Sequence, residues 1–370
     1  MTPPGFNPSF RPVPPGRSRD AAGRRPGVSL LLLLLLLSAG TAACAQAPPA
    51  ATTTSGGEAT LWAGLIKSKG YVVGSPLSSS GLHRFDGDTT WTHLGWNTPR
   101  IVGITYDPAD PQTLFLASGN GVLRTRDGGA SWRITTDWRV TEVQDVSLDT
   151  RRPDRVYLAS AYGVWRTEDG GETWAESNDG LLPPGNQYTQ TIEADYSAAD
   201  RVLVGTEDGV YVSTDGARSW RHAGGRGLEV LDLQQSRADS DVWIAATYRH
   251  GLLLSRDGGQ TWADGPAVAA GKSIHGVAID PTDGRRMMAV GWETGVLVSE
   301  DGGRTWDRRG DALPEDRFYE CVFDANVPGR MWAATLEEGV YRSDDLGRTW
   351  TDAGLFGTLV FDMLYVYPAP

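Results

Sequence analysis

Carboxylates recur at one position within the apolar, β-rich runs of this sequence, and they are the side chains best suited to chemistry here. With small gaps allowed, four runs carry them at this level: Asp145, Asp232, Glu320 and Asp362. Polar or aromatic residues lie one position earlier in their runs: Gln144, Gln190, His275 and Tyr319. Two carboxyl groups roughly 5 to 9.5 Å apart can hydrolyse a glycosidic bond, one as acid and the other as base or nucleophile. Asp145 and Glu320 are therefore the candidate catalytic pair.

Motifs for other catalytic chemistry are missing from the sequence. The five histidines are scattered, without the HExxH or CxxC spacing of a zinc site. No glycine-rich phosphate loop leads from a strand into a helix. Cys321 lies in the apolar run Phe318 to Phe323, so we expect a buried small hydrophobe and not a reactive thiol. We expect no cofactor and no metal ion.

An eight-residue motif that recurs along the chain indicates which elements position these residues. It begins with Ser or Thr, has Asp two residues later and ends in Ser/Thr-Trp, and a weaker, seven-residue copy precedes the six good ones. The final tryptophans are Trp91, Trp132, Trp174, Trp220, Trp262, Trp306 and Trp350. The aspartates are Asp86, Asp127, Asp169, Asp215, Asp257, Asp301 and Asp345. The tryptophans are 41 to 46 residues apart, the length of one four-stranded propeller blade.

The motif has the composition of a tight turn. Asp can hydrogen-bond loop amides, and Gly adopts positive φ without steric cost. The Trp is expected to start the next strand and to pack between blades. The alternative, that the aspartates are metal ligands or catalytic acids, does not explain one design repeated so regularly, so we interpret the motif as structural.

The residues between the motifs complete each blade. A glycine followed by two apolar residues lies eleven residues before each of the last six tryptophans and predicts a third strand, as at Gly121. Second strands are expected upstream, as at Thr113 to Ala117, and first strands before those, as at Val143 to Leu148.

The two ends of residues 59–370 are expected to share one blade. The domain begins with a second strand, Ala59 to Gly64, and ends with an unpartnered first strand, Leu359 to Tyr365. Joining them closes a ring, which removes open sheet edges. The sequence therefore predicts an all-β, seven-bladed β-propeller with four-stranded blades.

The motif resembles the Asp-box, or bacterial neuraminidase (BNR), repeat, whose pattern is Ser/Thr-x-Asp-x-Gly-x-Thr-Trp, and the resemblance covers residues 59–370. It implies that the boxes lie on the turn between third and fourth strands, away from the active face. Sialidases, xyloglucanases, sortilin-type receptors and photosystem II assembly-factor propellers share the repeat. The chain looks most similar to exported bacterial BNR-repeat proteins.

The enzymes of this family have features that the chain lacks. Sialidases carry an Arg-Ile-Pro motif, and the nearest fragment here is Arg100-Ile101-Val102. Xyloglucanases act in a cleft between two propellers, and only one fits this length. The resemblance therefore favours a non-catalytic binding or assembly scaffold, with a glycoside hydrolase of sialidase-like or related type as the alternative.

Ligands of such propellers meet the mouth of the central channel. Candidate ligand residues lie in the loops there and on the inner strands: Tyr162, Tyr248, Arg249, Trp292, Glu293, Asp232 and Asp362. Aromatic rings beside carboxylates suit a sugar or a peptide. Two alternatives remain open: the loops are simply solvated, and the channel carboxylates either solvate a wide, wet channel or hold a cation.

The N-terminus has the order of a secretory signal, with basic, apolar and small-residue regions ending near Cys44. Thr41 to Cys44 resembles a lipobox, which would make residues 1–43 a signal peptide and Cys44 a lipidation site. Cleavage after Ala45 is the alternative. Residues 44–58 are then a flexible tether, and the protein is exported and membrane-anchored, or otherwise periplasmic or secreted.

Charge narrows the choice of partners. The net charge is −12, and removing residues 1–43 takes away five arginines and one aspartate and lowers it to −16. With few basic clusters, nucleic acid is not expected as a partner, and membrane contact is expected only through the lipid anchor. A monomer that binds a glycan or a protein is the prediction.

Overall fold

The computed structural model describes residues 57–69, 80–96, 100–181 and 188–368. The predicted signal peptide and the predicted lipidation site Cys44 lie outside these residues. Tyr71 and Pro76, which follow the predicted strand Ala59 to Gly64 in the sequence, also lie outside them. In the described part of the chain, no helix is long and apolar enough to span a membrane.

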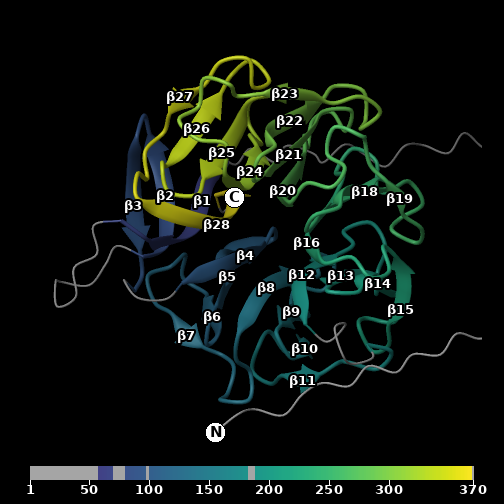
Figure 1. Cartoon of the computed structure of the whole chain (residues 1–370). Coiled ribbons are helices and arrows are strands. Elements are labelled where there is room, and N and C mark those ends of the chain that lie inside the picture. Colours follow the sequence, from purple (N-terminus) through teal and green to yellow (C-terminus); the bar gives the residue numbers. More distant parts are fainter. Residues whose placement is uncertain (1–56, 70–79, 97–99, 182–187, 369–370) are drawn as a thin grey trace, which may run out of the picture. The chain divides into compact units, whose positions relative to one another are not determined.

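The chain folds into seven four-stranded antiparallel sheets arranged as the blades of a propeller (Figure 1). Blade 1 has the strand order β28-β1-β2-β3, and blades 2 to 7 follow in chain order from β4–β7 to β24–β27. The innermost strands are β28 (Thr358–Val366), β4 (Ile101–Asp107), β8 (Val143–Leu148), β12 (Thr189–Ala194), β16 (Val230–Gln235), β20 (Ile274–Ile279) and β24 (Phe318–Phe323). The prediction of an all-β, seven-bladed propeller is confirmed.

The outer strands become shorter toward the rim. The second strands are β1 (Thr60–Lys67), β5 (Asp110–Ser118), β9 (Val156–Ser160), β13 (Val202–Thr206), β17 (Trp243–Thr247), β21 (Met287–Gly291) and β25 (Met331–Thr335). The third strands are β2 (Gly81–Gly87), β6 (Gly121–Thr125), β10 (Gly163–Thr167), β14 (Gly209–Ser213), β18 (Gly251–Ser255), β22 (Gly295–Ser299) and β26 (Val340–Ser343). The fourth strands are β3 (Thr90–Leu94), β7 (Arg133–Ile134), β11 (Ala175–Glu176), β15 (Arg221–Gly224), β19 (Ala263–Asp264), β23 (Asp307–Arg309) and β27 (Thr351–Asp352).

The ring closes in blade 1, where the two ends of the domain meet. Strand β28 pairs antiparallel with β1, from Thr60 opposite Val366 to Lys67 opposite Thr358. The side chains of Val360 and Met363 are buried in a cluster shared with blade 7. The predicted closure by the C-terminal strand is therefore confirmed.

Each repeated motif forms a turn that is held by its aspartate. In blade 4 the Asp215 Oδ1 atom accepts hydrogen bonds from the Ser213 hydroxyl (2.7 Å) and the Ser219 amide (2.9 Å). Its Oδ2 atom accepts from the Ser219 hydroxyl (2.6 Å). Burial opposes ionisation, but these hydrogen bonds outweigh it and lower the pKa of Asp215 to about 2. The same pattern recurs at Asp127, Asp169, Asp257, Asp301 and Asp345.

We expect Asp215→Ala to lower the free energy of unfolding by about 1–3 kcal/mol, because four donors of the turn, the Arg218 amide among them, lose their acceptor. Asp215→Asn keeps one acceptor oxygen and should cost less. Urea denaturation monitored by Trp fluorescence measures both changes. An unchanged midpoint for the alanine variant would contradict this role for the carboxylate.

Two details of the motif differ from the sequence prediction. The Trp does not start the next strand in the last six copies, because each fourth strand begins one residue later, as at Arg133 after Trp132. The weaker copy in blade 1 forms a shorter hairpin turn, in which Asp86 accepts hydrogen bonds from Arg84 (3.0 Å) and Thr92. Because this turn is one residue shorter, it does not form the set of hydrogen bonds to the aspartate that the other turns share.

Seven apolar clusters, one between each pair of adjacent blades, form the core. Each contains one of the motif tryptophans, so Trp220 lies with blades 3 and 4 and Trp306 with blades 5 and 6. The Trp220 Nε1 atom donates to the Ser177 carbonyl of blade 3 (2.7 Å). These rings therefore pack as joints between blades, away from the channel.

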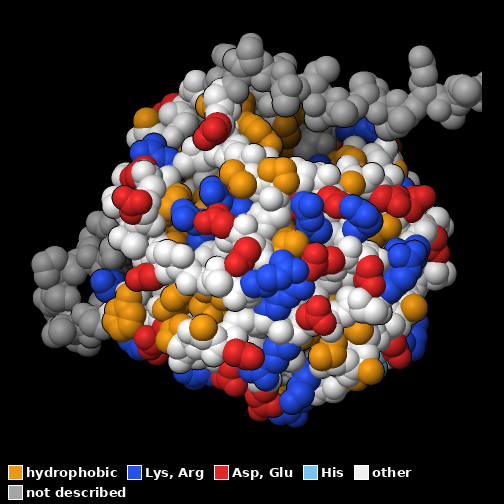
Figure 2. Space-filling model, turned by 90° about the horizontal axis from the view of Figure 1, so that it is seen from above, with side chains coloured by type: hydrophobic (Ala, Val, Ile, Leu, Met, Phe, Trp, Pro, Cys, Tyr) orange, Lys and Arg blue, Asp and Glu red, His pale blue; other side chains and the backbone are white. Residues whose placement is uncertain are grey.

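Charged side chains pair within and across blades around the rim. Arg309 and Arg348 both donate to Glu300 at 2.6 Å and 2.9 Å, and Arg124 donates to Glu172 at 2.7 Å. Figure 2 shows basic and acidic side chains intermixed over one edge of the molecule. Charged side chains on the rim are therefore commonly neutralised by neighbouring side chains of opposite charge.

Candidate functional site

The inner strands all begin at one end of the channel, which we call the mouth face. It is built by the loops that join second to third strands and by the loops that lead from one blade into the next (Figure 1). The repeated turns join third to fourth strands and therefore lie at the opposite face. Function is accordingly sought at the mouth.

A β-bulge near the start of every inner strand brings equivalent residues to one level of the channel. The bulged residues are Val102, Gln144, Gln190, Leu231, His275, Tyr319 and Phe361. The residues just below them are Gly103, Asp145, Thr191, Asp232, Gly276, Glu320 and Asp362. The four carboxylates aligned from the sequence thus share one level, each on a different blade.

These carboxylates hold neighbouring blades together. The Asp145 Oδ2 atom accepts from the Ile192 amide of blade 4 (2.9 Å), and the Asp232 Oδ2 atom from the Val277 amide of blade 6 (2.9 Å). Asp362 accepts from the Ile104 amide of blade 2 at 2.5 Å. Each bond satisfies an inner-strand amide that has no further strand to pair with. This use of the carboxylates is structural.

Burial raises the pKa of every channel carboxyl group. The pKa of Asp145 rises to about 7 and that of Asp232 to about 6, because protein surrounds them although the channel leaves them partly accessible. Burial, followed by the charge of neighbouring carboxylates, raises the pKa of Glu320 and Asp362 well above the usual range. Burial also raises the pKa of Glu193, which lies two residues below this level, to about 8.

Backbone amides donate to three oxygens of the candidate catalytic pair, Asp145 and Glu320. Both oxygens of Asp145 accept hydrogen bonds, from Val146 (2.7 Å) and Ile192, and Glu320 accepts from the Cys321 amide (2.9 Å). Cys321 is buried, as expected. Among the described residues, no group of three or more His, Cys, Asp or Glu could hold a metal ion.

Aromatic rings line one side of the mouth, and we call Trp292, His275, Tyr319 and Phe361 the aromatic arc. Their successive ring centroids are 4.8, 5.0 and 5.7 Å apart, and the His275 and Tyr319 rings are stacked. Arg100 lies over the Phe361 ring at 5.1 Å and ends the arc. Burial lowers the pKa of His275 to about 4, so the imidazole is neutral at physiological pH.

Acidic and phenolic groups line the other side, and we call Glu142, Tyr162, Tyr188, Glu207 and Glu229 the acidic arc. The Tyr162 hydroxyl donates to Glu142 (2.9 Å), and Gln190 donates to Glu229 (3.1 Å). Burial and then the charge of Glu207 raise the pKa of Glu229. Burial and then the charges of the three glutamates, Glu142 first, raise the pKa of Tyr188.

The predicted ligand residues lie in three places. Trp292 belongs to the aromatic arc and Tyr162 to the acidic arc, whereas Asp232 and Asp362 lie deeper in the channel. Tyr248 and Arg249 form a separate stacked pair at 4.9 Å on blade 5. Glu293 points to Lys272 (3.4 Å) and has positive φ, as a tight-turn residue does. The structure thus brings only some of these residues together.

Sequence reasoning missed several residues of the mouth face. Trp96, Trp138 and Phe356 are exposed there, on loops that lead from one blade into the next. A search for aromatic residues in those loops could have found them. Glu193 was also missed, although it alternates with buried residues along β12 and so could have been assigned to the channel.

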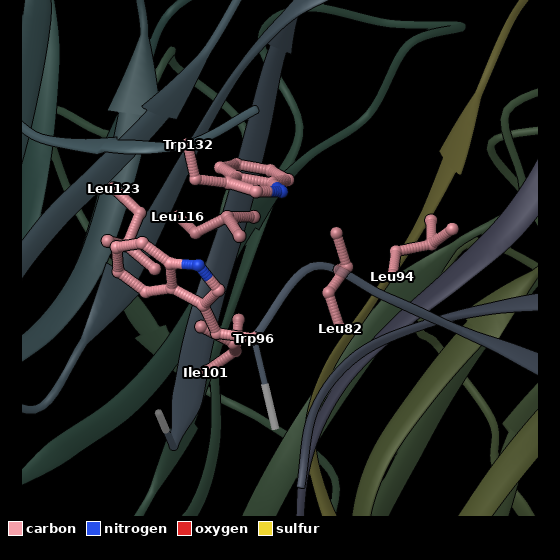
Figure 3. Close-up of a pocket in the computed structure, with 7 residues that line it drawn as sticks. All are labelled: Leu82, Leu94, Trp96, Ile101, Leu116, Leu123 and Trp132. Atoms are coloured by element: carbon pink, nitrogen blue, oxygen red, sulfur yellow. The ribbon is translucent and has the colours of Figure 1, made fainter. Parts of the chain in front are cut away.

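The cavities of the described part are small. The one in Figure 3 lies between blades 1 and 2, has a volume of about 10 Å³, and is lined by Leu82, Leu94, Trp96, Ile101, Leu116, Leu123 and Trp132. This space suits a water molecule at most. Another, of about 100 Å³, lies beside His250 and Asp264 at the edge of blade 5. Neither of these two cavities could enclose a sugar or a peptide.

Comparison with solved structures supports the propeller fold. No family model and no curated protein sequence matches the chain. Among solved structures, a GH74 enzyme of Niastella koreensis matches with a TM-score of 0.64 and 16% identity over 82% of this chain and 55% of that one. YCF48 bound to D1 peptide matches with a TM-score of 0.54 and 18% identity over 68% of this chain and 81% of that one.

The chain shares their propeller fold. The extracellular domain of a putative hybrid two component system, BT4673 of B. thetaiotaomicron, also matches, with a TM-score of 0.54 and 16% identity over 75% of this chain and 37% of that one. The chain spans only 55% of the length of the GH74 enzyme. At these identities the comparisons establish the architecture, and function has to be argued from the mouth.

Proposed function

We propose that the protein is an exported, non-catalytic binding or assembly scaffold whose ligand, a glycan or a protein, binds at the channel mouth. The distribution of exposed large hydrophobic side chains carries this proposal. Seven of the ten among the described residues lie on mouth-face loops: Trp96, Trp138, Tyr162, Tyr248, Val268, Trp292 and Phe356. Apolar side chains gathered on one face, and aromatic ones above all, are typical of interaction sites.

The two ends of the described domain lie away from this face. Strand β1 begins and β28 ends at the face opposite the mouth, because Thr60 pairs with Val366. The Ala59 amide donates to the Asn326 side chain (2.9 Å) in a loop of that opposite face. A tether formed by residues 44–58, with or without a lipid at Cys44, would therefore leave from the far side. An anchored protein would present its mouth away from the membrane.

The structural neighbours support binding outside the cytoplasm. YCF48 was solved bound to a D1 peptide, which supports a peptide as a ligand for a propeller of this fold. The BT4673 neighbour is an extracellular domain. These neighbours support an extracytoplasmic location and a protein partner for the proposed scaffold.

A glycoside hydrolase is the alternative. The pKa of Asp145 at about 7 suits a general acid, and the GH74 neighbours are named as enzymes. Against it, both Asp145 oxygens already bind backbone amides. We expect no turnover in a chromogenic-glycoside screen. Turnover abolished by Asp145→Asn or Glu320→Gln would favour the enzyme.

Changing the mouth is expected to remove binding without unfolding the protein. Trp292→Ala and Tyr248→Ala remove exposed rings of the mouth face. Each should lower the affinity for a ligand found on glycan and peptide arrays by at least about tenfold. Ile134→Ala is the control, since Ile134 is also an exposed hydrophobic residue but lies on the outer strand β7. Equal binding by all three variants would count against the mouth as the site.

A further inference from the structure

The mouth is divided into two chemically different halves. The aromatic arc comes from blades 6, 7 and 1, and Arg100, which leads into blade 2, lies at its end. The acidic arc comes from blade 3, blade 4 and the loop into blade 5. A ligand over the channel would therefore meet apolar rings on one side and negative charge on the other.

The glutamates of the acidic arc lack cationic partners. Within the described residues, Glu142, Glu207 and Glu229 form no ion pair, and the bonds to Glu142 and Glu229 come from neutral groups. Several carboxylates on other mouth-face loops are paired, as in Lys69–Glu338 (2.5 Å) and Arg317–Glu315 (3.0 Å). Uncompensated negative charge beside an interface is complementary to a positively charged partner.

The aromatic arc points to a ligand independently of charge. Trp292, at the outer end of the arc, is 38% exposed, and the His275 and Tyr319 rings continue the surface inward. The imidazole Nε2 atom is buried without a hydrogen-bond partner, so this half offers ring faces and little polar recognition. An apolar or aromatic side chain packs well on such rings, and a cation beside them gains cation–π attraction.

We propose that the partner is a basic segment of another protein, with a Lys or Arg side chain facing the acidic arc and an apolar or aromatic side chain on the aromatic arc. The inference rests on the proposed function, since it names the class of ligand for the same mouth. It favours a peptide over a neutral glycan, because a neutral sugar would stack on the rings but leave the three glutamates uncompensated.

The test uses the purified protein and three fluorescein-labelled peptides, of alternating Lys-Phe, Glu-Phe and Lys-Ser sequence, with binding followed by fluorescence anisotropy. The Lys-Phe peptide should bind at least about tenfold more tightly than either of the others. Its affinity should fall at least about tenfold between 50 and 500 mM NaCl, since exposed charges are then screened. A neutral glycan array is probed in parallel.

Variants separate the two halves of the mouth. The triple change Glu142→Gln, Glu207→Gln and Glu229→Gln should lower Lys-Phe affinity at least about tenfold and remove most of its salt dependence. Trp292→Ala should lower the affinity and leave the salt dependence in place. The matched control is Glu58→Gln with Glu176→Gln, two exposed glutamates away from the mouth, which should bind as the wild type does. Melting temperatures confirm that each variant is folded.

The outcomes distinguish this inference from the function on which it rests. Equal binding of the Glu-Phe and Lys-Phe peptides, or a triple variant with wild-type affinity, would overturn the basic-segment proposal. Binding to neutral glycans alone, lost in Trp292→Ala, would overturn it too but would retain the scaffold function. If neither peptides nor glycans bind, the proposed function fails with it.

Discussion

Removing the last twelve residues, 359–370, will leave the protein unfolded or aggregated. The deletion takes away nearly all of β28 and so exposes the backbone edge of β1 from Thr60 to Ile66. It also empties a cluster that contains the buried side chains of Val360, Met363 and Tyr365. Losing one such side chain costs about 2–5 kcal/mol, and a domain has only about 5–15 kcal/mol of stability. Size-exclusion chromatography and thermal melting by circular dichroism measure the effect.

A shorter deletion is the matched control. Removing only residues 367–370 leaves β28 (Thr358–Val366) complete, and Tyr367 and Pro368 are exposed. This variant should remain soluble and monomeric, with a melting temperature close to that of the full chain. If the twelve-residue deletion behaved in the same way, closure of the ring by the C-terminal strand would not be what holds the fold.

The propeller was predictable because its information is local and repeated. Each blade contains its own turn motif and its own glycine before the third strand, so errors in one copy are corrected by the others. Several predicted strands, such as Val143 to Leu148, match the observed bounds. The closure was predictable for a related reason, because a second strand without a first one at Ala59 has a single possible partner at the C-terminus.

The arrangement of the mouth was less predictable, because it depends on contacts between blades. Aligning the repeats within the sequence placed Asp145 and Glu320 at one level, but it could not show that backbone amides occupy the Asp145 oxygens. Likewise, Trp292, His275 and Tyr319 come from two blades and stack only because bulges aim successive inner strands at the channel. Such distances follow from the closed ring, which no single repeat encodes.

The free energy of unfolding is expected to rise as the pH falls from 8 to about 5.5. Five buried channel carboxyls have raised pKa values, with Asp145 at about 7, Glu193 at about 8 and Asp232 at about 6. Glu320 and Asp362 shift in the same direction. A group with a raised folded pKa stabilises the fold below its unfolded pKa, and this stability is lost as the pH rises through the folded value.

Other groups oppose this trend only in part. Burial lowers the pKa of His83 and His275 to about 4, so each loses stability as the pH falls below 6.5. Burial also lowers the pKa of His222, so three histidines act against five carboxyls. The turn aspartates, such as Asp215 with a pKa of about 2, lose their stabilising effect only below about pH 4. We therefore expect a net gain on the order of 3–5 kcal/mol between pH 8 and 5.5, measured by urea denaturation.

Glu193→Gln tests the channel as the origin of this pH dependence. Among the described channel carboxyls, that of Glu193 alone accepts no hydrogen bond, so an amide leaves no former donor unpaired. The charged groups around it are Arg237, Asp145, Asp232 and Asp195. At pH 8 the variant should be more stable than the wild type by on the order of 2 kcal/mol, because a buried negative charge is removed. At pH 5, where the wild-type group is protonated, the two should unfold together. Exposed Glu176→Gln should change neither value. A Glu193→Gln variant that is destabilised equally at both pH values would instead show that the carboxyl acts through packing, and that the wild-type protein gains its acid stability elsewhere.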